Sequence, residues 1–190
     1  MKVINLYGSS GSGKSTNAAG LAYELKTEGL KVETINEYAK ELCISNSSHL
    51  LDNQTWVFAN QYQKMKYLSE DLDFVITDSP LMLSMFYGVK YEYEFDSLFP
   101  LVKEVYNSFD NINIFLERNH PWDPYARVQS EDESSDDSKE LEKFLQQHKV
   151  DYKKFKTGRY LPAILKKYIV DNNMDVIQEH YNKITAAAKH

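Results

Sequence analysis

The first fifteen residues constrain the fold of this chain more than any other stretch. An apolar segment, Met1–Tyr7, runs directly into Gly-Ser-Ser-Gly-Ser-Gly-Lys-Ser at positions 8–15, and an alanine-rich segment follows. This string matches G-x-x-x-x-G-K-S, the phosphate-binding P-loop, in the context of strand, loop and helix that the motif requires. The chain is therefore predicted to begin with a buried strand, a phosphate-binding loop and a helix over Lys14–Glu28.

The residue types of the loop explain what it would bind. Glycines let successive backbone N–H groups turn toward phosphate oxygens, and the start of the following helix adds the positive end of its dipole. We expect Lys14 to reach the β- and γ-phosphates and Ser15 to ligate Mg²⁺. The predicted nucleotide-binding residues of the loop are Gly8, Ser10, Gly11, Ser12, Gly13, Lys14, Ser15 and Thr16. The alternative, a flexible Gly/Ser turn, would also have to explain the strand and helix around it.

Composition indicates a small enzyme with one core. The chain has 190 residues, of which 42% are hydrophobic, so we expect a single α/β domain over residues 1–190. The net charge of −6 gives no general basic surface for a nucleic acid, although a local basic groove stays possible. No apolar run approaches the roughly 20 residues of a membrane span, and the N-terminus resembles a strand more than a signal peptide. Cys43 is the only cysteine, which favours a reducing, cytoplasmic location.

A carboxylate follows the second predicted strand. This strand covers Lys31–Asn36, and Glu37 comes directly after it. In an open parallel sheet the ligand lies outside the carboxyl ends of the strands, so Glu37 is expected to face the same crevice as the P-loop. We predict that Glu37 receives or orients the hydroxyl proton of a phosphoryl acceptor. The alternative is that Glu37 only opens the next helix, where an acidic residue favours the helix dipole.

The segment Asp52–Glu70 is predicted to be a helix with one apolar face. Residues three and four positions apart form that face: Phe58, Gln61, Tyr62 and Met65. Rings and an amide are what a pocket for a flat heterocycle uses, so we predict that Gln61 contacts the acceptor base and that Trp56 or Phe58 stacks on it. The alternative is that this face is ordinary core.

A second acidic signal follows the strand Phe74–Thr77. Asp78 comes next, and Pro80 prevents the strand from continuing. This is the position of the acidic residue that supports Mg²⁺ in P-loop enzymes. Asp78 is therefore predicted to lie across from Ser15 and to share the metal ion with it.

The remaining elements are predicted from apolar spacing and turn residues. They are helices at Leu81–Gly88 and about Asp96–Phe109, a strand at Asn111–Leu116, an amphipathic helix to about His148, a last strand at Val150–Phe155, a helix to about Tyr168, and a tail over about 171–190 that contains a final helix. The acidic run Ser130–Glu142 is interpreted as a solvated face or a mobile hinge rather than a metal site.

Arginine is rare in this chain, and its positions suggest a lid. Of 22 basic residues only Arg118, Arg127 and Arg159 are arginines. The planar guanidinium suits bidentate contact with phosphate. Arg118 and Arg127 flank a loop with proline and tryptophan, so we predict a lid over about 118–145 that stabilises the charge of the transferring phosphate. Arg159 is predicted to line the nucleotide base, with a simple turn as the alternative.

Taken in order, four segments resemble a known family. Gly8–Ser15, Asn36–Glu41, Gln61 and Val75–Pro80 are similar to the small P-loop kinases related to the nicotinamide riboside kinase domain. The stretch 118–133 resembles the lid of phage-encoded members described as nucleoside or nucleotide kinases, except that Ala126 stands where such lids often have glycine. The resemblance covers about residues 1–168.

This resemblance implies an α/β, three-layer P-loop NTPase fold with a central, mostly parallel sheet, flanking helices and a lid segment. It also implies ATP with Mg²⁺ as donor and a nucleoside or nucleoside monophosphate as acceptor. The implied working residues are Lys14, Ser15, Glu37, Asp78 and the lid arginines Arg118 and Arg127.

Residues 37–110 contain no arginine for an acceptor phosphate, which favours a nucleoside slightly over a monophosphate. Lysines could substitute as point charges: Lys40, Lys64, Lys66 and Lys90. Two other classes stay open, a kinase acting on a base or an end of DNA, and a nucleotide-binding ATPase switch without an acceptor. The negative net charge disfavours the first. A homodimer is compatible with each of these readings.

Overall fold

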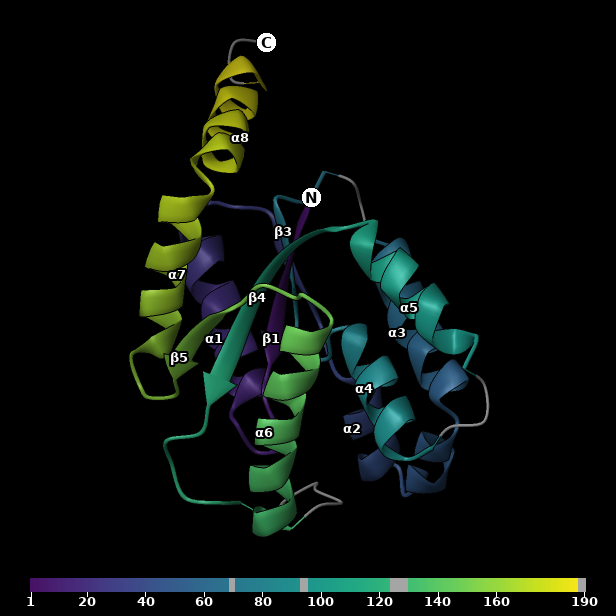
Figure 1. The fold of residues 1–190 in the computed structure, drawn as a ribbon. Coiled ribbons are helices and arrows are strands. Elements are labelled where there is room, and N and C mark those ends of the chain that lie inside the picture. Colours follow the sequence, from purple (N-terminus) through teal and green to yellow (C-terminus); the bar gives the residue numbers. More distant parts are fainter. Residues whose placement is uncertain (69–70, 93–95, 124–129, 188–190) are drawn as a thin grey trace.

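The computed structural model of the protein describes residues 1–68, 71–92, 96–123 and 130–187. In these residues five strands form one sheet in the order β2-β3-β1-β4-β5, and every neighbouring pair runs parallel (Figure 1). The strands are β1 Lys2–Tyr7, β2 Val32–Ile35, β3 Phe74–Thr77, β4 Asp110–Glu117 and β5 Lys153–Lys156. The strand that precedes the P-loop sequence is thus the central one, and the predicted α/β fold with a parallel sheet is confirmed.

Both faces of this sheet are covered, and successive strand residues alternate between them. In β1, Val3 and Tyr7 belong to one buried cluster, while Ile4 and Leu6 belong to the other. All four side chains have no exposed surface. The sheet therefore separates two cores, and the central strands β1 and β3 are almost entirely buried.

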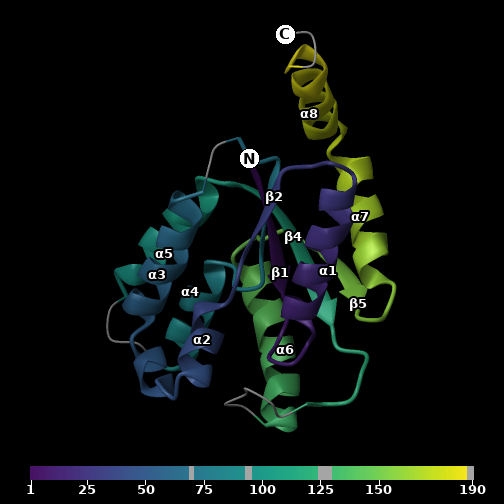
Figure 2. The same cartoon turned by 180° about the vertical axis from the view of Figure 1, so that it is seen from behind.

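The first core, which we call the aliphatic face, lies under α1 (Lys14–Thr27) and α7 (Leu161–Asn172), which lie side by side in Figure 2. Its buried helix residues are Ala18, Leu21, Ala22, Leu25, Leu161, Leu165 and Ile169. The two helices approach closely, since a Cβ built on Gly20 would lie 2.6 Å from Cγ of Pro162. Small and branched aliphatic residues thus fix the helix that carries the P-loop lysine.

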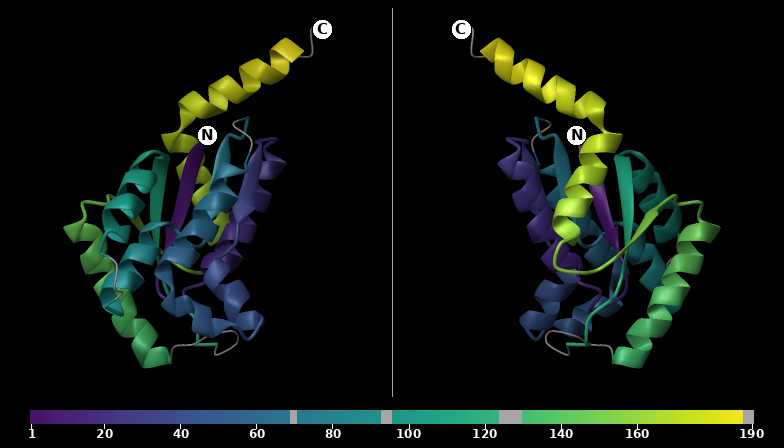
Figure 3. Two further views of the ribbon diagram at one scale, coloured as in Figure 1. Left: turned by 90° about the vertical axis from the view of Figure 1, so that its right-hand side faces the viewer. Right: turned by 90° about the vertical axis from the view of Figure 1, so that its left-hand side faces the viewer.

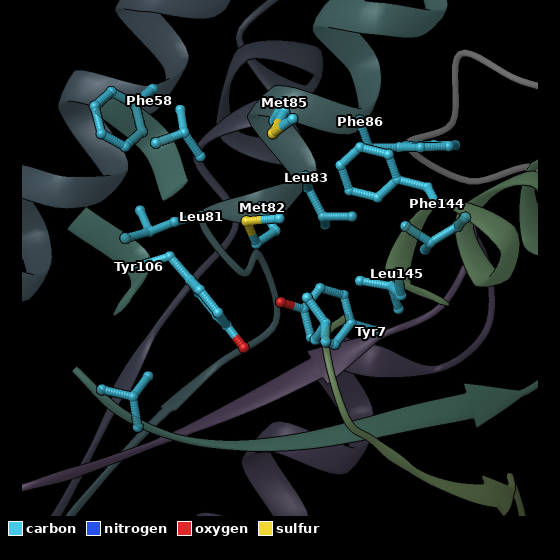
Figure 4. Packing of buried hydrophobic residues seen from close by; sticks show 14 of the residues in the cluster. Tyr7, Phe58, Leu81, Met82, Leu83, Met85, Phe86, Tyr106, Phe144 and Leu145 are labelled. Atoms are coloured by element: carbon cyan, nitrogen blue, oxygen red, sulfur yellow. The ribbon is translucent and has the colours of Figure 1, made fainter. Parts of the chain in front are cut away.

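The second core, the aromatic face, lies under four helices: α3 (Gln54–Lys66), α4 (Met82–Lys90), α5 (Leu98–Asn107) and α6 (Glu131–Gln147). Figure 4 shows how its side chains meet between the helices and the sheet. Nearly half of the buried residues in this cluster are aromatic or methionine: Tyr7, Phe58, Met65, Met82, Met85, Phe86, Tyr106, Phe115 and Phe144. Burial raises the pKa of the Tyr7 phenol well above its usual value, with a further contribution from the nearby Tyr106.

Element boundaries follow the predictions with three differences. The expected helix at Asp52–Glu70 is shorter, because a 3₁₀ helix, η1 (Ser48–Asp52), precedes α3. A short helix, α2 (Tyr38–Ile44), follows Glu37. The last strand begins at Lys153 and not at Val150. Val150 is buried in the aromatic face, and its amide N bonds the carbonyl oxygen of Leu145 at the end of α6 and not a strand.

The acidic run after Ser130 is mostly exposed, as the prediction of a solvated face requires, but it is helical and not a hinge. It forms the first half of α6, which begins with a capping box in which Ser130 and Glu133 bond each other's backbone N–H groups. The bonds from Ser130 lower the pKa of the Glu133 carboxyl. Ser134 is fully buried, and Asp137 is 2% exposed and bonded to Nζ of Lys90. The run therefore has a buried side that composition does not reveal.

The C-terminal helix α8 (Met174–Ala187) leaves the body of the domain (Figure 3). Its first half is attached by a buried pair, in which Nδ1 of His180 lies 2.7 Å from Oδ2 of Asp73. Nζ of Lys2 also donates to Oδ1 of Asn173, just before the helix. Among the described helices, none combines the length and the apolar character needed to span a lipid bilayer.

Candidate functional site

The P-loop connects β1 to α1, and its glycines have backbone conformations that other residues rarely adopt. The φ angles are 143° at Gly8, 70° at Gly11 and 82° at Gly13. A Cβ built on Gly8 would lie 2.5 Å from Oγ of Ser12 and 2.8 Å from the carbonyl oxygen of Leu116. The loop can therefore close tightly only with glycine at this position.

Lys14 is the first residue of α1 and is held inside the loop. Its Nζ donates to the carbonyl oxygens of Gly8, at 2.9 Å, and Ser9, at 3.0 Å, and the residue is 8% exposed. Lys14, Ser15 and Thr16 all line the main cavity of the described structure. The sequence-predicted phosphate end of the site is thus assembled around one buried ammonium group.

A tryptophan lies over the loop. A Cβ built on Gly11 would lie 2.6 Å from Cζ3 of Trp122. The guanidinium of Arg118 lies over the same ring, 5.1 Å from its centroid, and Nη2 of Arg118 is 3.1 Å from Oε1 of Glu131. Nη1 of Arg118 is buried and has no hydrogen-bond partner among the described residues. Trp122 and Glu131 therefore fix one predicted lid arginine beside the phosphate-binding loop.

Helix α6 touches the loop from another side. The hydroxyl of Ser134 donates to the carbonyl oxygen of Ser10 at 2.6 Å and lies 3.1 Å from Oγ of Ser9. Further along the helix, Leu141 and Leu145 belong to the aromatic face. From Glu131 on, the segment predicted as a lid is therefore a helix anchored in the core. Arg127 and Ala126 lie outside the described residues.

Asp78 directly follows β3, beside the central strand. It is 2% exposed, and its Oδ1 has no hydrogen-bond partner within the part of the chain that the structure describes. The next residue, Ser79, lines the main cavity, and the amide N of Ser79 donates to Oγ1 of Thr77. A buried carboxylate oxygen thus stands at the edge of the site where the sequence predicts a metal ligand.

The main cavity measures about 510 Å³ and joins the P-loop to the helices on its other side. Besides the loop, its lining comprises Glu37, Ala39, Lys40 and Cys43 around the start of α2, Ser48, Leu51 and Asp52 of η1, Gln54 and Val57 of α3, and Ser79, Leu83, Ser84, Tyr87 and Tyr91 around α4. Glu37 is the N-cap residue of α2 and makes no side-chain cap bond. Glu37 therefore both precedes α2 as its N-cap residue and lines the cavity.

The three residues predicted to bind the acceptor base do not line this cavity. Phe58 is 4% exposed and packs in the aromatic face, where its ring stacks with Tyr62. Nε2 of Gln61 donates to Oγ1 of Thr77, and Gln61 is 2% exposed. Trp56 is 49% exposed, and its Nε1 donates to the Tyr38 hydroxyl. The predicted face of α3 exists, but in this structure it is a core face.

The loop after β5 lies beside the P-loop, as the prediction for the nucleotide base requires. A Cβ built on Gly13 would lie 3.6 Å from the methyl carbon Cγ2 of Thr157 and 3.5 Å from Nε2 of His120. Oγ1 of Thr157 also accepts from the amide N of Asn119. Arg159 has its guanidinium over the ring of Tyr160, at 5.9 Å. Among the described contacts, it is therefore Thr157 that approaches the P-loop, whereas Arg159 contacts Tyr160.

Sequence reasoning missed several residues of the cavity wall. They are Ser48, Leu51, Asp52, Gln54, Val57, Leu83, Ser84, Tyr87 and Tyr91. Asp52 was the predicted start of a helix, and the other residues carried no motif. Only the packing of η1 and α4 against the P-loop side brings them together.

The solved structures that share this fold include two complexes of NadR and a thymidylate kinase. The NadR protein in complex with NAD and AMP-PNP superposes with a TM-score of 0.63 and 18% identity, covering 83% of this chain and 45% of the NadR chain. NadR in complex with NR gives a TM-score of 0.63, 18% identity, and coverages of 80% and 45%. The thymidylate kinase from Ehrlichia chaffeensis gives 0.57, 15% identity, and coverages of 83% and 88%. These likenesses establish the fold of P-loop kinases, and the chain spans less than half the length of NadR.

No curated protein matches the chain significantly. One family model does match, an AAA domain, over residues 3–160. That range contains the whole sheet, the P-loop and every described residue of the main cavity. The chain therefore belongs to this AAA domain family.

Proposed function

We propose that the protein transfers the γ-phosphoryl group of ATP to a hydroxyl of a nucleoside or nucleoside monophosphate. One observation carries the proposal: the same cavity of about 510 Å³ is lined by Lys14 and Ser15 of the P-loop and by the carboxylate residue Glu37. A nucleotide-binding switch needs only the part of this cavity that the P-loop lines. A kinase also needs a second wall for an acceptor, with a base at the junction.

The residues of the donor end fit a triphosphate. The positive φ angles of Gly11 and Gly13 and the crowded Gly8 make a loop whose N–H groups can turn inward. Lys14 would contact the β- and γ-phosphates, and Arg118 would offer them its Nη1, which has no partner among the described residues. Arg127 is proposed as a second lid arginine. Ser10, Ser12 and Thr16 are proposed to support the phosphates, and Arg159 the base side.

A magnesium ion fits Oδ1 of Asp78, which has no hydrogen-bond partner within the described ranges, with the Ser15 hydroxyl as the second ligand. When bound, the ion would neutralise charge on the phosphates. Asp78 follows β3, and Ser15 lies in the first turn of α1, and their roles would be to fix the position of the ion relative to Lys14.

At the acceptor end, Glu37 would accept the proton of the attacking hydroxyl as the oxygen bonds to phosphorus. Asp52, the second carboxylate of the wall, would hold another hydroxyl of the sugar. The apolar residues Leu51, Val57 and Leu83 and the ring of Tyr87 would surround the base. Gln61, Trp56 and Phe58 would then act only through the packing of α3.

A neutral nucleoside fits this wall better than a monophosphate. Beyond the P-loop, Lys40 is the one cationic lining residue among those described, whereas Glu37 and Asp52 are both acidic. A second phosphate would approach two carboxylates with a single ammonium group to offset them. We therefore place nucleosides first and monophosphates second.

The test is a panel of nucleosides, their monophosphates, nicotinamide riboside and short DNAs with Mg·ATP. ADP release is followed, and products are identified by mass. A nucleoside heavier by one phosphoryl group supports the proposal, whereas a phosphorylated DNA would indicate a polynucleotide kinase. ADP release without any phosphorylated product would indicate an ATPase switch.

Two variants separate the two ends of the site. Lys14→Ala should abolish turnover, while Glu37→Gln should lower kcat by about 100-fold or more and leave ATP affinity nearly unchanged. Glu41→Gln, at an exposed position on the same helix, is the matched control and should retain activity. Normal turnover of Glu37→Gln with a phosphorylated acceptor would refute the role of Glu37 as base.

A further inference from the structure

One residue of the main cavity wall carries a buried acceptor atom that no described residue uses. Gln54 is the first residue of α3, lines the cavity, and is 7% exposed. Its Nε2 donates to the carbonyl oxygen of Leu51 at 2.8 Å. Its Oε1 is buried and has no hydrogen-bond partner among the described residues. A folded protein rarely leaves such an oxygen unpaired unless a ligand completes it.

The bond to Leu51 decides which end of the amide is available. An amide side chain can present either a donor or an acceptor, and a rotation exchanges the two. Here the carbonyl oxygen of Leu51 requires the NH₂ end, so the oxygen is the end left for a ligand. Gln54 therefore offers its carbonyl oxygen Oε1, and the partner of this oxygen must be a hydrogen-bond donor.

The surroundings of Gln54 suit a flat heterocycle. Leu51, Val57 and Leu83 contribute apolar wall, and Tyr87 contributes a ring. The phosphate-binding residues belong to the opposite wall, at the start of α1. An acceptor whose hydroxyl lies near Glu37 and the P-loop would therefore direct its base toward η1, α3 and α4.

We propose, building on the kinase function above, that Gln54 determines specificity by accepting a hydrogen bond from an N–H group of the acceptor's base. The substrate class is thus a nucleoside whose base carries a ring imide or amide N–H, an exocyclic amine or a carboxamide. Bases in which methyl groups replace every such hydrogen are rejected, because they leave the buried Oε1 unpaired.

Gln61 offers a useful contrast. Its Oε1 is also buried without a partner among the described residues, but Gln61 does not line the cavity, and its Nε2 bonds Thr77 in the core. The assignment to Gln54 therefore depends on access to the cavity as well as on the missing partner.

The experiment measures kcat/KM of the full chain with matched nucleoside pairs: thymidine and N3-methylthymidine, inosine and N1-methylinosine, adenosine and N6,N6-dimethyladenosine. We expect the methylated member of the preferred pair to be about 10- to 100-fold poorer. In Gln54→Leu the ratio should fall toward one, mainly through loss of activity on the unmethylated member. Gln54→Glu keeps acceptor oxygens and should retain a preference.

Gln63→Leu, at an exposed position of the same helix, is the matched control and should keep the full ratio. Thermal melting of each variant shows whether it is folded, and the Gln54→Glu result decides the case if Gln54→Leu is not. Equal use of both members of every pair by the unaltered protein would overturn the role of Gln54 and leave the kinase function standing. Absence of any phosphorylated nucleoside would overturn both.

Discussion

The two faces of the sheet are covered by different types of side chain. On the aliphatic face, α1 and α7 pack through leucine, isoleucine and alanine, and Phe74 is the one aromatic ring in the buried set. On the aromatic face, rings and methionines fill the space under four helices. The main cavity opens on this second side, where Val57 of α3 and Leu83 of α4 line it.

This difference separates two tasks. Branched aliphatic side chains have few rotamers and close packing, so they hold the P-loop helix in one position against the sheet. Methionine and aromatic side chains fill irregular spaces and tolerate adjustment. For the kinase proposed above, this difference would give a rigid donor end and an adaptable acceptor end that can admit and release a second substrate.

The largest expected effect is on the aliphatic face. Leu21 has no exposed surface, so Leu21→Ala should lower the free energy of unfolding by about 2–5 kcal/mol. Leu101→Ala is the control, because Leu101 is 49% exposed on α5. Urea unfolding followed by circular dichroism measures both. Similar losses for the two variants would mean that the aliphatic face is not a tightly packed core.

The same substitution can be made in a helix on each face. Gly20→Ala would place a Cβ 2.6 Å from the Pro162 ring, and Gly88→Ala would place one 2.7 Å from the Phe99 ring. Both changes gain about 1 kcal/mol of helix propensity. The Pro162 ring is fixed to the backbone of α7, so Gly20→Ala should be destabilising by about 1–3 kcal/mol.

Phe99 is only partly buried and can rotate, so Gly88→Ala should cost clearly less. The comparison needs only the difference between the two melting temperatures. A greater loss for Gly88→Ala would reverse the assignment of the rigid and adaptable faces.

A smaller effect is expected for a change of shape at constant volume. Met82 is 1% exposed on the aromatic face, and Met82→Leu should change the free energy of unfolding by less than about 1.5 kcal/mol. Leu165→Met is the matched change on the aliphatic face. Chemical denaturation of both variants should show the smaller loss for Met82→Leu, and the opposite order would argue against an adaptable aromatic face.

The smallest effect concerns an ion pair between α6 and β5. The hydrogen bond from Lys154 lowers the pKa of the Glu142 carboxyl. Because the folded pKa lies below the unfolded one, the stabilisation is present above the unfolded pKa and is lost as pH falls through the folded pKa. Glu142→Gln should remove up to about 1 kcal/mol at neutral pH and flatten the acid side of the stability curve. Unfolding series between pH 3 and about pH 7 test this, and an unchanged acid slope would contradict it.

The donor end could be predicted from sequence because its determinants are local. Gly8 to Ser15 encode a backbone shape, and a strand followed by an acidic residue encodes the position of Asp78. Parallel sheets place such strand ends at one edge, so Glu37 also arrives where it was expected. Helix periodicity likewise identified the buried face of α3 through Phe58, Gln61 and Met65.

The cavity wall proposed to hold the acceptor could not be predicted because its determinants are tertiary. Periodicity shows which side of α3 is buried, but not that the cavity meets only its first turn, at Gln54 and Val57. Composition likewise describes the run after Ser130 as acidic. It cannot show that Ser134 faces the P-loop, although the capping-box spacing from Ser130 to Glu133 could have signalled a helix.

The position of Trp122 has an optical consequence. The chain contains two tryptophans, and Trp56 lies on the outside of α3, whereas the indole of Trp122 rests against Gly11 and under the Arg118 guanidinium. A Trp56→Phe variant would thus carry a single tryptophan, and its indole lies in contact with the P-loop. Its emission would report the state of that loop directly, without any attached dye and before any product is formed.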